Sequence, residues 1–344
     1  MRVLDIHGHV SAPGGNGAQL VGGMLASNTP TTLDPLKNDI PNLSMTEQGW
    51  AGSVKRHTDQ MEDHEIDAQL IGPRPFLMLG WMSKHLLPSW TRFVNNCIAK
   101  QVTVRPDRFV GAAMLPQDPD APDLSGCLEE LDRCVNGLGF KGVYLSPDPS
   151  GDRRSPGMNT SYWDPVYARC EQLGLPIIVH GTNCIDPRIG IIPQNYQVGF
   201  LWEQFLATQL LMHGDAFERF PGLKVLVCHC GGALDRFIKT DPHLGQKDRS
   251  NNLFFDTNAL DLDFLEAAIK QRTPKQTAFG TETPGSGSAK RPETGRQGDD
   301  LVPYIGKMPF LSEDDKRLIF ESNSTKLCPA LAKTTGKATG VRLP

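Results

Sequence analysis

The sequence lacks the features that mark membrane proteins and nucleic-acid-binding proteins. No apolar run approaches the roughly 20 residues that a helix needs to cross a bilayer. Lys and Arg number 35 against 39 Asp and Glu, which gives a formal net charge of −4 and no basic footprint for nucleic acid. We therefore expect a protein that binds neither a membrane nor nucleic acid.

The sequence also lacks the cysteine spacing of zinc ribbons and redox motifs. Its eight cysteines are scattered through predicted helices and strands, and none forms a Cys-x-x-Cys pair. The N-terminus has no basic, apolar and cleavage-site regions of a secretory signal. Reduced thiols and a cytoplasmic location are therefore expected.

What is present is the composition of an ordinary globular protein, with short apolar segments that alternate with helical segments. The predicted strands are residues 3–6, 69–71, 109–113, 142–145, 175–180, 223–229, 253–256 and 276–280. Strands that are apolar throughout are typical of a parallel sheet buried on both faces. Eight strand-then-helix units predict a distorted (β/α)8 barrel with long loops after its strands, and a doubly wound sheet is the alternative.

Domain limits and loops follow from the same pattern. We expect one domain over residues 1–332 and a polar tail over 333–344. The main predicted helices are 44–64, 90–105, 123–136, 163–173 and 201–220. Residues 11–43 are rich in Gly, Pro, Asn and Thr, and loops of this length are usually functional or disordered, so we expect a loop over the mouth of the site.

Two histidines, His7 and His9, follow the first predicted strand at positions i and i+2. Residues two apart point to the same side of a strand, so both rings can reach one point. Imidazole suits zinc and similar divalent metals. Taken alone, the pair could also be two incidental histidines near the N-terminus.

Further polar side chains stand at the C-terminal ends of other predicted strands, namely Arg74, His180, His229 and Glu282. Active sites of α/β barrels are built at this end. Histidines with a merely structural role have no reason to gather there, so the pattern predicts a metal site. Its neutral nitrogen ligands would be His7, His9 and His180.

The remaining side chains have a functional and a structural interpretation. Glu282 would either complete the metal shell or act as an acid or base beside it. His229 would hold a water or move its proton, or else be a further ligand or a buried histidine. Arg74 would pair with a substrate carboxylate or with an acid in a loop. Glu47 has capping-box spacing from Ser44, which favours a helix cap.

At these residues the chain resembles the amidohydrolase superfamily, in the branch that contains aminocarboxymuconate-semialdehyde decarboxylase. That branch has His-x-His after the first strand, His after the fifth and sixth, and usually Gly-Thr-Asp after the eighth. Here the last motif is Gly280-Thr281-Glu282, a departure. A closer likeness, to the 4-oxalomesaconate hydratases, rests on residues 5–9, 111–117, 147–151, 254–257, 292–295 and 299–300.

The resemblance implies a zinc-dependent hydratase, or one that uses another divalent metal such as Mn²⁺. Its substrate would be an unsaturated keto-acid with several carboxylates, met in the breakdown of aromatic acids. Glu47, His229 and Glu282 would be catalytic. The candidate substrate-binding residues are Arg74, Asn183 and Arg291.

Other functions stay open at this point. The same metal chelation serves a non-oxidative decarboxylase of an aromatic or muconate-type acid, and a hydrolase of the superfamily is a third choice. A silent barrel that only binds a ligand would be expected to lose a metal ligand, and none is missing. We also expect a homo-oligomer, a dimer.

Overall fold

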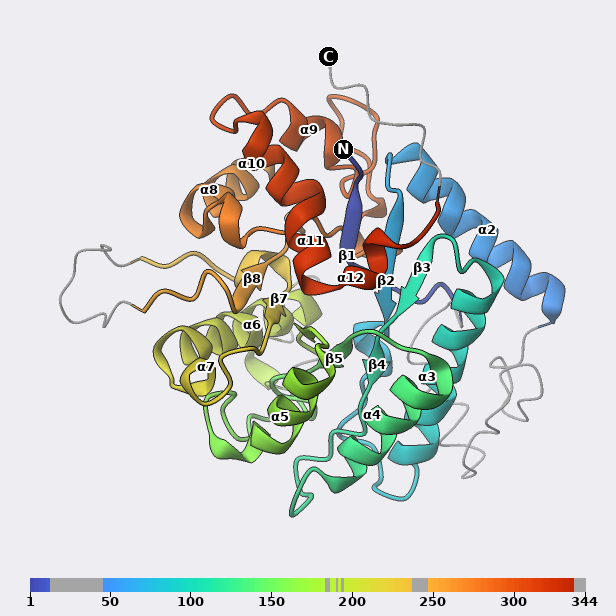
Figure 1. Cartoon of the computed structure of the whole chain (residues 1–344), viewed down its shortest axis with the longest axis vertical. Coiled ribbons are helices and arrows are strands. Elements are labelled where there is room, and N and C mark those ends of the chain that lie inside the picture. The colour runs from blue at the N-terminus through green and yellow to red at the C-terminus, as the bar shows by residue number, and fades with distance from the viewer. Residues whose placement is uncertain (13–45, 183–185, 190, 193–194, 237–246, 337–344) are drawn as a thin grey trace.

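The computed structural model describes residues 1–12, 46–182, 186–189, 191–192, 195–236 and 247–336. Most of the predicted loop over residues 11–43, together with Ser44 and Asn183, lies outside these residues. Figure 1 shows short strands at the centre of the molecule with helices arranged around them.

The strands are buried along their whole length and pair in parallel. They run in the order β1-β2-β3 in one sheet and β4-β5-β6-β7-β8 in the other. Their bounds are β1 (Leu4–His9), β2 (Ala68–Gly72), β3 (Phe109–Gly111), β4 (Ala113–Met114), β5 (Val143–Leu145), β6 (Ile177–Val179), β7 (Val225–Val227) and β8 (Leu253–Phe255). These strands lie within or beside seven of the eight predicted ranges, with both β3 and β4 in the range 109–113. The predicted strand 276–280 forms only an isolated bridge, between Thr277 and Phe255.

Backbone hydrogen bonds outside the strands close the two sheets into one barrel. Ala112 lies between β3 and β4, and its amide donates to the Ile71 carbonyl of β2 at 2.9 Å. The strands β3 and β4 therefore occupy one position in the barrel, as a single strand with a break. The Ala278 amide donates to the Phe255 carbonyl at 2.8 Å, and the Ile6 amide donates to the Phe279 carbonyl at 2.9 Å. Residues 277–283 thus stand between β8 and β1, and the predicted (β/α)8 barrel is confirmed.

All five predicted helices are present, although their ends differ, and α8 is a further helix that the predicted ranges do not include. The barrel helices are α2 (Glu47–Asp63), α3 (Leu87–Val104), α4 (Ser125–Leu138), α5 (Asp164–Leu173), α6 (Asn195–His213), α7 (Ala216–Arg219) and α8 (Leu262–Arg272). The first begins at Glu47 because the Thr46 hydroxyl accepts from the Gly49 amide as N-cap. The predicted helix 201–220 is two helices, separated near Gly214.

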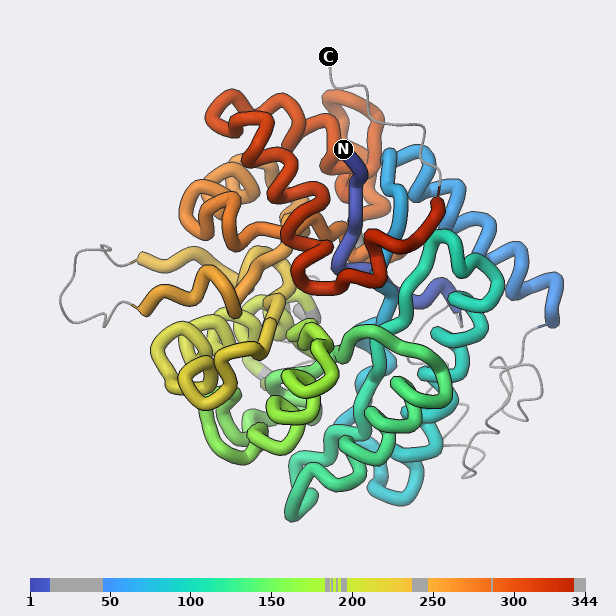
Figure 2. The backbone as a smooth tube through the Cα atoms, viewed as in Figure 1, coloured from blue at the N-terminus to red at the C-terminus, as the bar shows by residue number. Residues whose placement is uncertain are grey.

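The C-terminal helices close the end of the barrel at which the strands begin. They are α9 (Val302–Gly306), α10 (Glu313–Arg317), α11 (Asn323–Leu327) and α12 (Pro329–Ala332). The Ser324 hydroxyl donates to the carbonyl of Leu4, the first residue of β1, at 2.8 Å. In Figure 2 the red segment of α11 and α12 lies across β1 and β2, so the opposite end of the barrel remains for a site.

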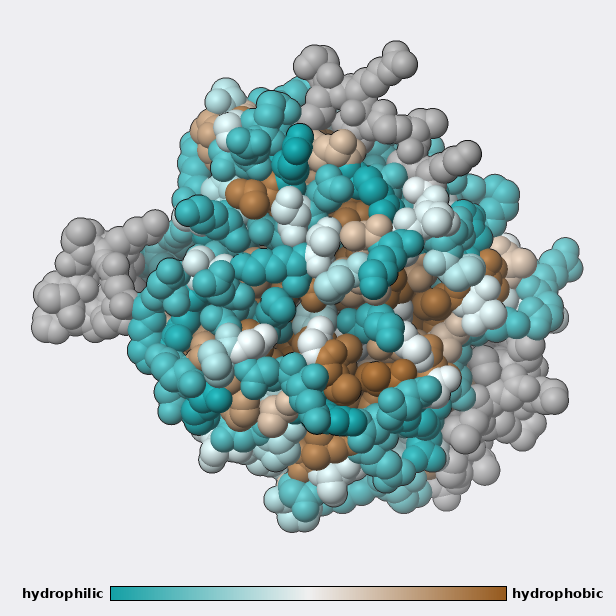
Figure 3. Space-filling view, in the orientation of Figure 1, coloured by the Kyte–Doolittle hydropathy of each residue, from teal (hydrophilic) through white to brown (hydrophobic). Residues whose placement is uncertain are grey.

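Hydrophilic side chains cover most of the face seen in Figure 3, with apolar patches between them. Among the described helices, none has the length and apolar content required to cross a membrane. The seven cysteines in the described ranges are buried and unpaired.

Candidate metal centre and active site

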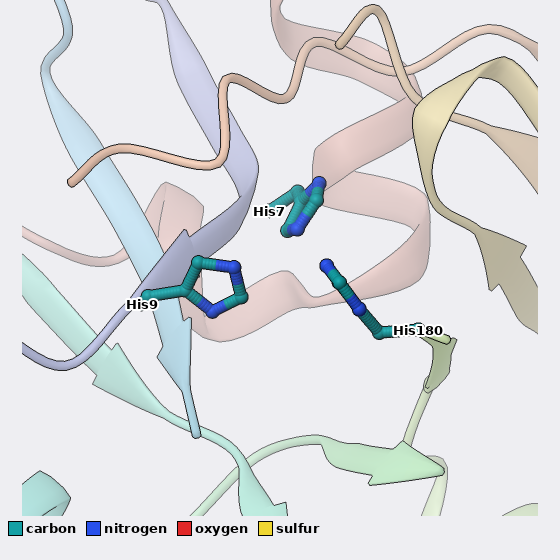
Figure 4. Close-up of side chains that lie close together, drawn as sticks. All are labelled: His7, His9 and His180. Carbon is teal, nitrogen blue, oxygen red and sulfur yellow. The ribbon is translucent and has the colours of Figure 1, made fainter. Parts of the chain in front are cut away.

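The side chains of His7, His9 and His180 converge at the C-terminal end of the barrel (Figure 4). His7 and His9 lie on β1, and His180 directly follows β6. All three are buried, and their ring centroids are 5.1, 5.1 and 5.2 Å apart. One ligand atom from each lies within 4.8 Å of the others, so the predicted cluster forms.

Each of the three rings is held by an acceptor at its Nδ1 atom. The acceptors are Asp256 Oδ2 at 2.6 Å from His7, the Pro73 carbonyl at 2.8 Å from His9 and the Gly181 carbonyl at 2.7 Å from His180. A carbonyl oxygen can only accept, so the proton of His9 and of His180 resides on Nδ1 and the lone pair on Nε2. The same tautomer follows for His7 beside a carboxylate.

The Nε2 atoms of the three histidines are the unsatisfied atoms of the site. All three are buried and lack a hydrogen-bond partner among the described residues. Leaving a buried polar atom unpaired costs about 1–3 kcal/mol, so three at one point require an explanation. Three imidazole lone pairs that face one point fit a divalent metal, and zinc favours this donor set.

The protonation of the rings agrees with this fit. Burial lowers the pKa of His9 and of His180 to about 4. Burial also lowers the pKa of His7, although Asp256 acts in the opposite direction. The three imidazoles are therefore neutral near pH 7, which is the form that coordinates a metal.

Asp256 is a site residue that our sequence reasoning did not single out. It follows β8, is buried, and also accepts a hydrogen bond from the Cys230 amide at 2.8 Å. Burial raises the pKa of Asp256, but the hydrogen bond with His7 outweighs it and holds the pKa below its usual range. A carboxylate behind a metal-binding histidine orients the ring and raises its basicity.

Glu282 reaches the cluster from the segment that closes the barrel. Its amide donates to the His7 carbonyl at 2.7 Å, which fixes the segment against β1. Its Oε1 atom lies 3.9 Å from Nε2 of His9 and 3.9 Å from Nε2 of His180. The side chain of Asn258 donates to the other oxygen, Oε2, at 3.2 Å. The carboxylate therefore stands beside two of the three unpaired nitrogens, those of His9 and His180.

His229 pairs with Glu282 at the edge of the cluster. Its Nε2 atom lies 3.5 Å from Glu282 Oε1, and its Nδ1 atom lies 2.9 Å from the amide nitrogen of Gln204. Burial lowers the pKa of His229, but Glu282 raises it more, and the net shift is upward. Both residues have positive φ, 52° at His229 and 66° at Glu282, a strained conformation that is frequent at active sites.

A pocket of about 330 Å³ opens beside this pair. His229, Glu282 and Asn258 provide polar groups at its lining. The remaining lining residues are Gln197, Phe200, Leu201, Gly232, Ala259, Leu260, Asp261 and Phe264. An apolar pocket with a few convergent polar groups is the usual form of a small-molecule site.

Comparison with known families agrees with this geometry, because the amidohydrolase family matches residues 4–329. The chain belongs to the amidohydrolase family. Enzymes of this family depend on a divalent metal, and the three unpaired Nε2 atoms are where this amidohydrolase would hold one.

Two curated relatives illustrate the range of activities in the family. The 2-keto-4-carboxy-3-hexenedioate hydratase of Sphingobium sp. (strain NBRC 103272 / SYK-6) is 30% identical over 281 residues, which cover 79% of this chain and 81% of the relative. The gamma-resorcylate decarboxylase of Rhodococcus jostii (strain RHA1) is 29% identical over 189 residues, covering 52% of this chain and 56% of the relative.

Two solved structures show the same relationship. The 4-oxalomesaconate hydratase from Rhodopseudomonas palustris has a TM-score of 0.81 and 25% identity, covering 96% of this chain and 97% of that one. A dihydroxybenzoic acid decarboxylase from Polaromonas sp. JS666, with manganese and 2-nitroresorcinol bound, has a TM-score of 0.64 and 21% identity. It covers 95% of this chain and 96% of its own, and its likeness shows the fold alone.

Arg74 lies near the site of this amidohydrolase. Its Nε atom donates to the Val10 carbonyl at 2.9 Å, and its guanidinium carbon lies 5.8 Å from the centre of the Phe76 ring. Burial lowers the pKa of Arg74, and the charge of Glu282 opposes this shift. No carboxylate in the described ranges forms an ion pair with it, and the alternative of an acid in the loop of residues 13–45, outside these ranges, stays open.

Glu47 and Arg291 make contacts away from the histidines. The Glu47 side chain is 67% exposed and pairs with Lys100 at 2.7 Å. Arg291 donates to the Gly298 carbonyl at 2.8 Å, and its guanidinium carbon lies 5.1 Å from the centre of the Tyr304 ring. The structure thus brings together five of the predicted site residues and leaves these two outside the cluster.

Proposed function

We propose that this amidohydrolase is a hydratase that adds water to the carbon–carbon double bond of an unsaturated keto-acid with several carboxylates, such as 4-oxalomesaconate. The observation that carries the proposal is the Glu282–His229 pair, 3.5 Å apart, in which Glu282 lies 3.9 Å from the Nε2 atoms of His9 and His180. Hydration of a double bond needs both a base and an acid at adjacent carbons, and this pair supplies one of each. The hydratase relatives support the choice by the length over which they match.

His7, His9 and His180 would hold one divalent metal, zinc or an ion such as manganese. Glu282 would be its fourth ligand or would stand beside it. When bound, the metal would polarise a keto or carboxylate oxygen of the substrate and make the conjugated double bond more electrophilic.

The side chains of the chain perform the proton transfers. Glu282 accepts a proton from water as the water oxygen forms a bond to the β-carbon. The π electrons of the double bond move toward the keto group. His229 then donates a proton to the α-carbon, which restores the keto group. One water is added and no other group leaves.

The substrate carboxylates need cationic or amide partners. Arg74 is the leading candidate, because its guanidinium has no acidic partner among the described residues and its charge acts on Glu282. A catalytic Glu47 remains a prediction from the resemblance. Substrate binding by Arg291, and by Asn183 outside the described residues, remains a prediction from the sequence. Wild-type activity in Glu47→Gln would remove Glu47 from this set.

A non-oxidative decarboxylase of an aromatic acid is the second candidate. The observation in its favour is the match to gamma-resorcylate decarboxylase over about half of the chain. This reaction needs only a proton donor at the carbon that loses carbon dioxide, so it leaves one member of the Glu282–His229 pair without a role.

A spectroscopic assay separates the two candidates. Metal-loaded protein is mixed with a panel of unsaturated keto-tricarboxylates and hydroxybenzoates, and ultraviolet absorbance and carbon dioxide are followed together. The proposal expects loss of the enone absorbance of a tricarboxylate without carbon dioxide. Carbon dioxide release from the best substrate would replace the hydratase with the decarboxylase.

We also propose that the protein is located in the cytoplasm and forms a homodimer. The support for the dimer is a row of large apolar side chains exposed on α6, which includes Val198, Leu201, Trp202 and Leu206. Light scattering on the purified protein tests the dimer, and a monomer mass at micromolar concentration would exclude it.

A further inference from the structure

Outside the histidine cluster, buried polar side chains form a continuous chain of hydrogen bonds through β1, β2, α2 and α3. Its members, all buried, are Ser11, Gln101, His57, Gln69 and Asp5. None of them lines the pocket. The chain needs a role other than contact with the substrate.

The hydrogen bonds of this chain run in one direction. The amide and the hydroxyl of Ser11 donate to Gln101 Oε1 at 2.8 and 2.7 Å. Gln101 Nε2 lies 2.9 Å from Nδ1 of His57, and Nε2 of His57 lies 2.8 Å from Gln69 Oε1. Each amide therefore accepts through oxygen and donates through nitrogen, and His57 carries its proton on Nε2. The chain ends where Gln69 Nε2 donates to Asp5 Oδ2 at 2.8 Å.

Asp5 collects donors from both segments that present the site. On β1, the amide of His7 donates to Oδ1 at 2.9 Å. On the closing segment, Thr281 donates to Oδ2 through its hydroxyl at 2.6 Å and to Oδ1 through its amide at 3.3 Å. Gln69 also donates to the Thr283 carbonyl at 3.0 Å. The carboxylate of Asp5 thus connects His7, one of the three proposed metal ligands, to Thr281, the residue before Glu282.

Gly8 explains why this arrangement fits between the two histidines. A Cβ atom at position 8 would lie 2.1 Å from Cδ of Gln69, whose amide is hydrogen-bonded at both ends. The central residue of the His7-Gly8-His9 motif must therefore be glycine for Gln69 to reach Asp5.

We propose that Asp5, supported by Gln69, His57 and Gln101, is a positioning residue that holds the strand of His7 and His9 in register with the segment of Glu282 before a metal binds. Metal sites depend on ligands held close to the productive geometry by such supporting groups. This inference rests on the metal site of the proposed function and does not depend on the reaction.

The test compares Asp5→Asn with Asp67→Asn. Asp67 is a matched control, because it is also a buried carboxylate that accepts from a backbone amide, that of Val3 at 2.7 Å, and Val3 lies just before the start of β1, away from the site. The rate at which metal-loaded protein loses its ion to a chelator is measured, together with the unfolding temperature. Asparagine places an NH2 group against donors at Asp5, and loss of a supporting partner typically weakens metal binding about 10- to 100-fold.

We expect Asp5→Asn to release the metal about 10- to 100-fold faster than the wild type. Asp67→Asn should lose thermal stability but release the metal at the wild-type rate. Equal release rates for the two variants, fast or slow, would overturn the positioning role.

A measurement on metal-free protein separates this inference from the proposed function. Nitrogen chemical shifts of the imidazoles should report a protonated Nε2 in His57, and Asp5→Asn should change the shifts of His9 and His180 while Asp67→Asn does not. If the wild type takes up no metal, the proposed function fails and these shifts alone decide the inference. A proton on Nδ1 of His57, or unchanged shifts in Asp5→Asn, would contradict it.

Discussion

The floor of the site, formed by His7, His9, His180 and Glu282, differs in construction from its α6 wall, formed by Gln197, Phe200 and Leu201. On the floor, each of the three imidazoles is buried and fixed by an acceptor at Nδ1, and the amide of Glu282 donates to the His7 carbonyl of β1. The wall is largely apolar, and Leu201 is 38% exposed. Fixed rings with unpaired Nε2 atoms favour one function, the binding of a metal. The apolar side chains of the wall, in contrast, can be replaced to suit a different substrate at little cost in folding free energy.

The largest effect should follow from removing a ligand of the floor. His180→Ala leaves two of three imidazoles, so we expect metal content to fall from about one ion per chain to near zero, with activity lost. Elemental analysis of the purified variant measures this. His85→Ala, at an exposed histidine, serves as the control and should keep its metal. Full metal content in His180→Ala would contradict the proposed metal site.

Glu282→Gln should separate acid–base chemistry from metal binding. Glutamine keeps the size of the side chain but removes the base, so kcat should fall by about 100- to 10,000-fold. Metal content should survive at least in part, because the three histidines remain. Steady-state kinetics and elemental analysis on one preparation give both quantities. Complete loss of the metal would show that Glu282 acts mainly as a metal ligand.

Asp256→Asn should weaken the floor without removing a ligand. The amide keeps the shape but loses the charge behind His7, so we expect metal affinity to fall by about 10- to 100-fold. Competition with a chelator measures the affinity. An unchanged affinity would show that the ring of His7 is positioned without Asp256.

Arg74→Lys probes the boundary between floor and substrate. Lysine keeps the charge but cannot pair with a carboxylate through two parallel hydrogen bonds. We expect kcat/KM to fall by about tenfold or more, equivalent to about 1.4 kcal/mol, with metal content unchanged. Wild-type kinetics in this variant would make Arg74 a structural residue.

The smallest effect should come from the α6 wall. A methylene contact in an enclosed pocket is worth about 1–3 kcal/mol, and the half-exposed Leu201 lies near the lower limit. Leu201→Ala should therefore raise KM by about tenfold, while metal content and the unfolding temperature stay near the wild-type values. A variant that also lost its metal would show that the wall and the floor are not independent.

The part of the site that could be predicted from the sequence is the part that parallel strands impose. His7, His9, His180, His229 and Glu282 each follow a predicted strand, and the carboxyl ends of parallel strands meet at one end of a barrel. Asp256 satisfies the same rule at the end of residues 253–256, so the signal was present although its role as partner of His7 was not recognised.

Other features depend on contacts that a sequence pattern does not contain. The bond between His7 and Asp256 spans 249 positions, and the chain from Ser11 to Asp5 joins four elements. Helix ends are set locally by single groups, such as the Thr46 hydroxyl that begins α2, and the small helices of residues 302–332 carry too weak a period to be predicted.

The central claim is that the floor drives addition of water to a double bond, and isotopic labelling tests it most directly. Metal-loaded protein is incubated with 4-oxalomesaconate in H₂¹⁸O. The mass of the product is measured by mass spectrometry, and the release of carbon dioxide is recorded alongside. We expect a product heavier than the substrate by one labelled water and no release of carbon dioxide. In Glu282→Gln we expect the substrate to remain unchanged over the same time. A product lighter than the substrate by one carbon dioxide would contradict this expectation.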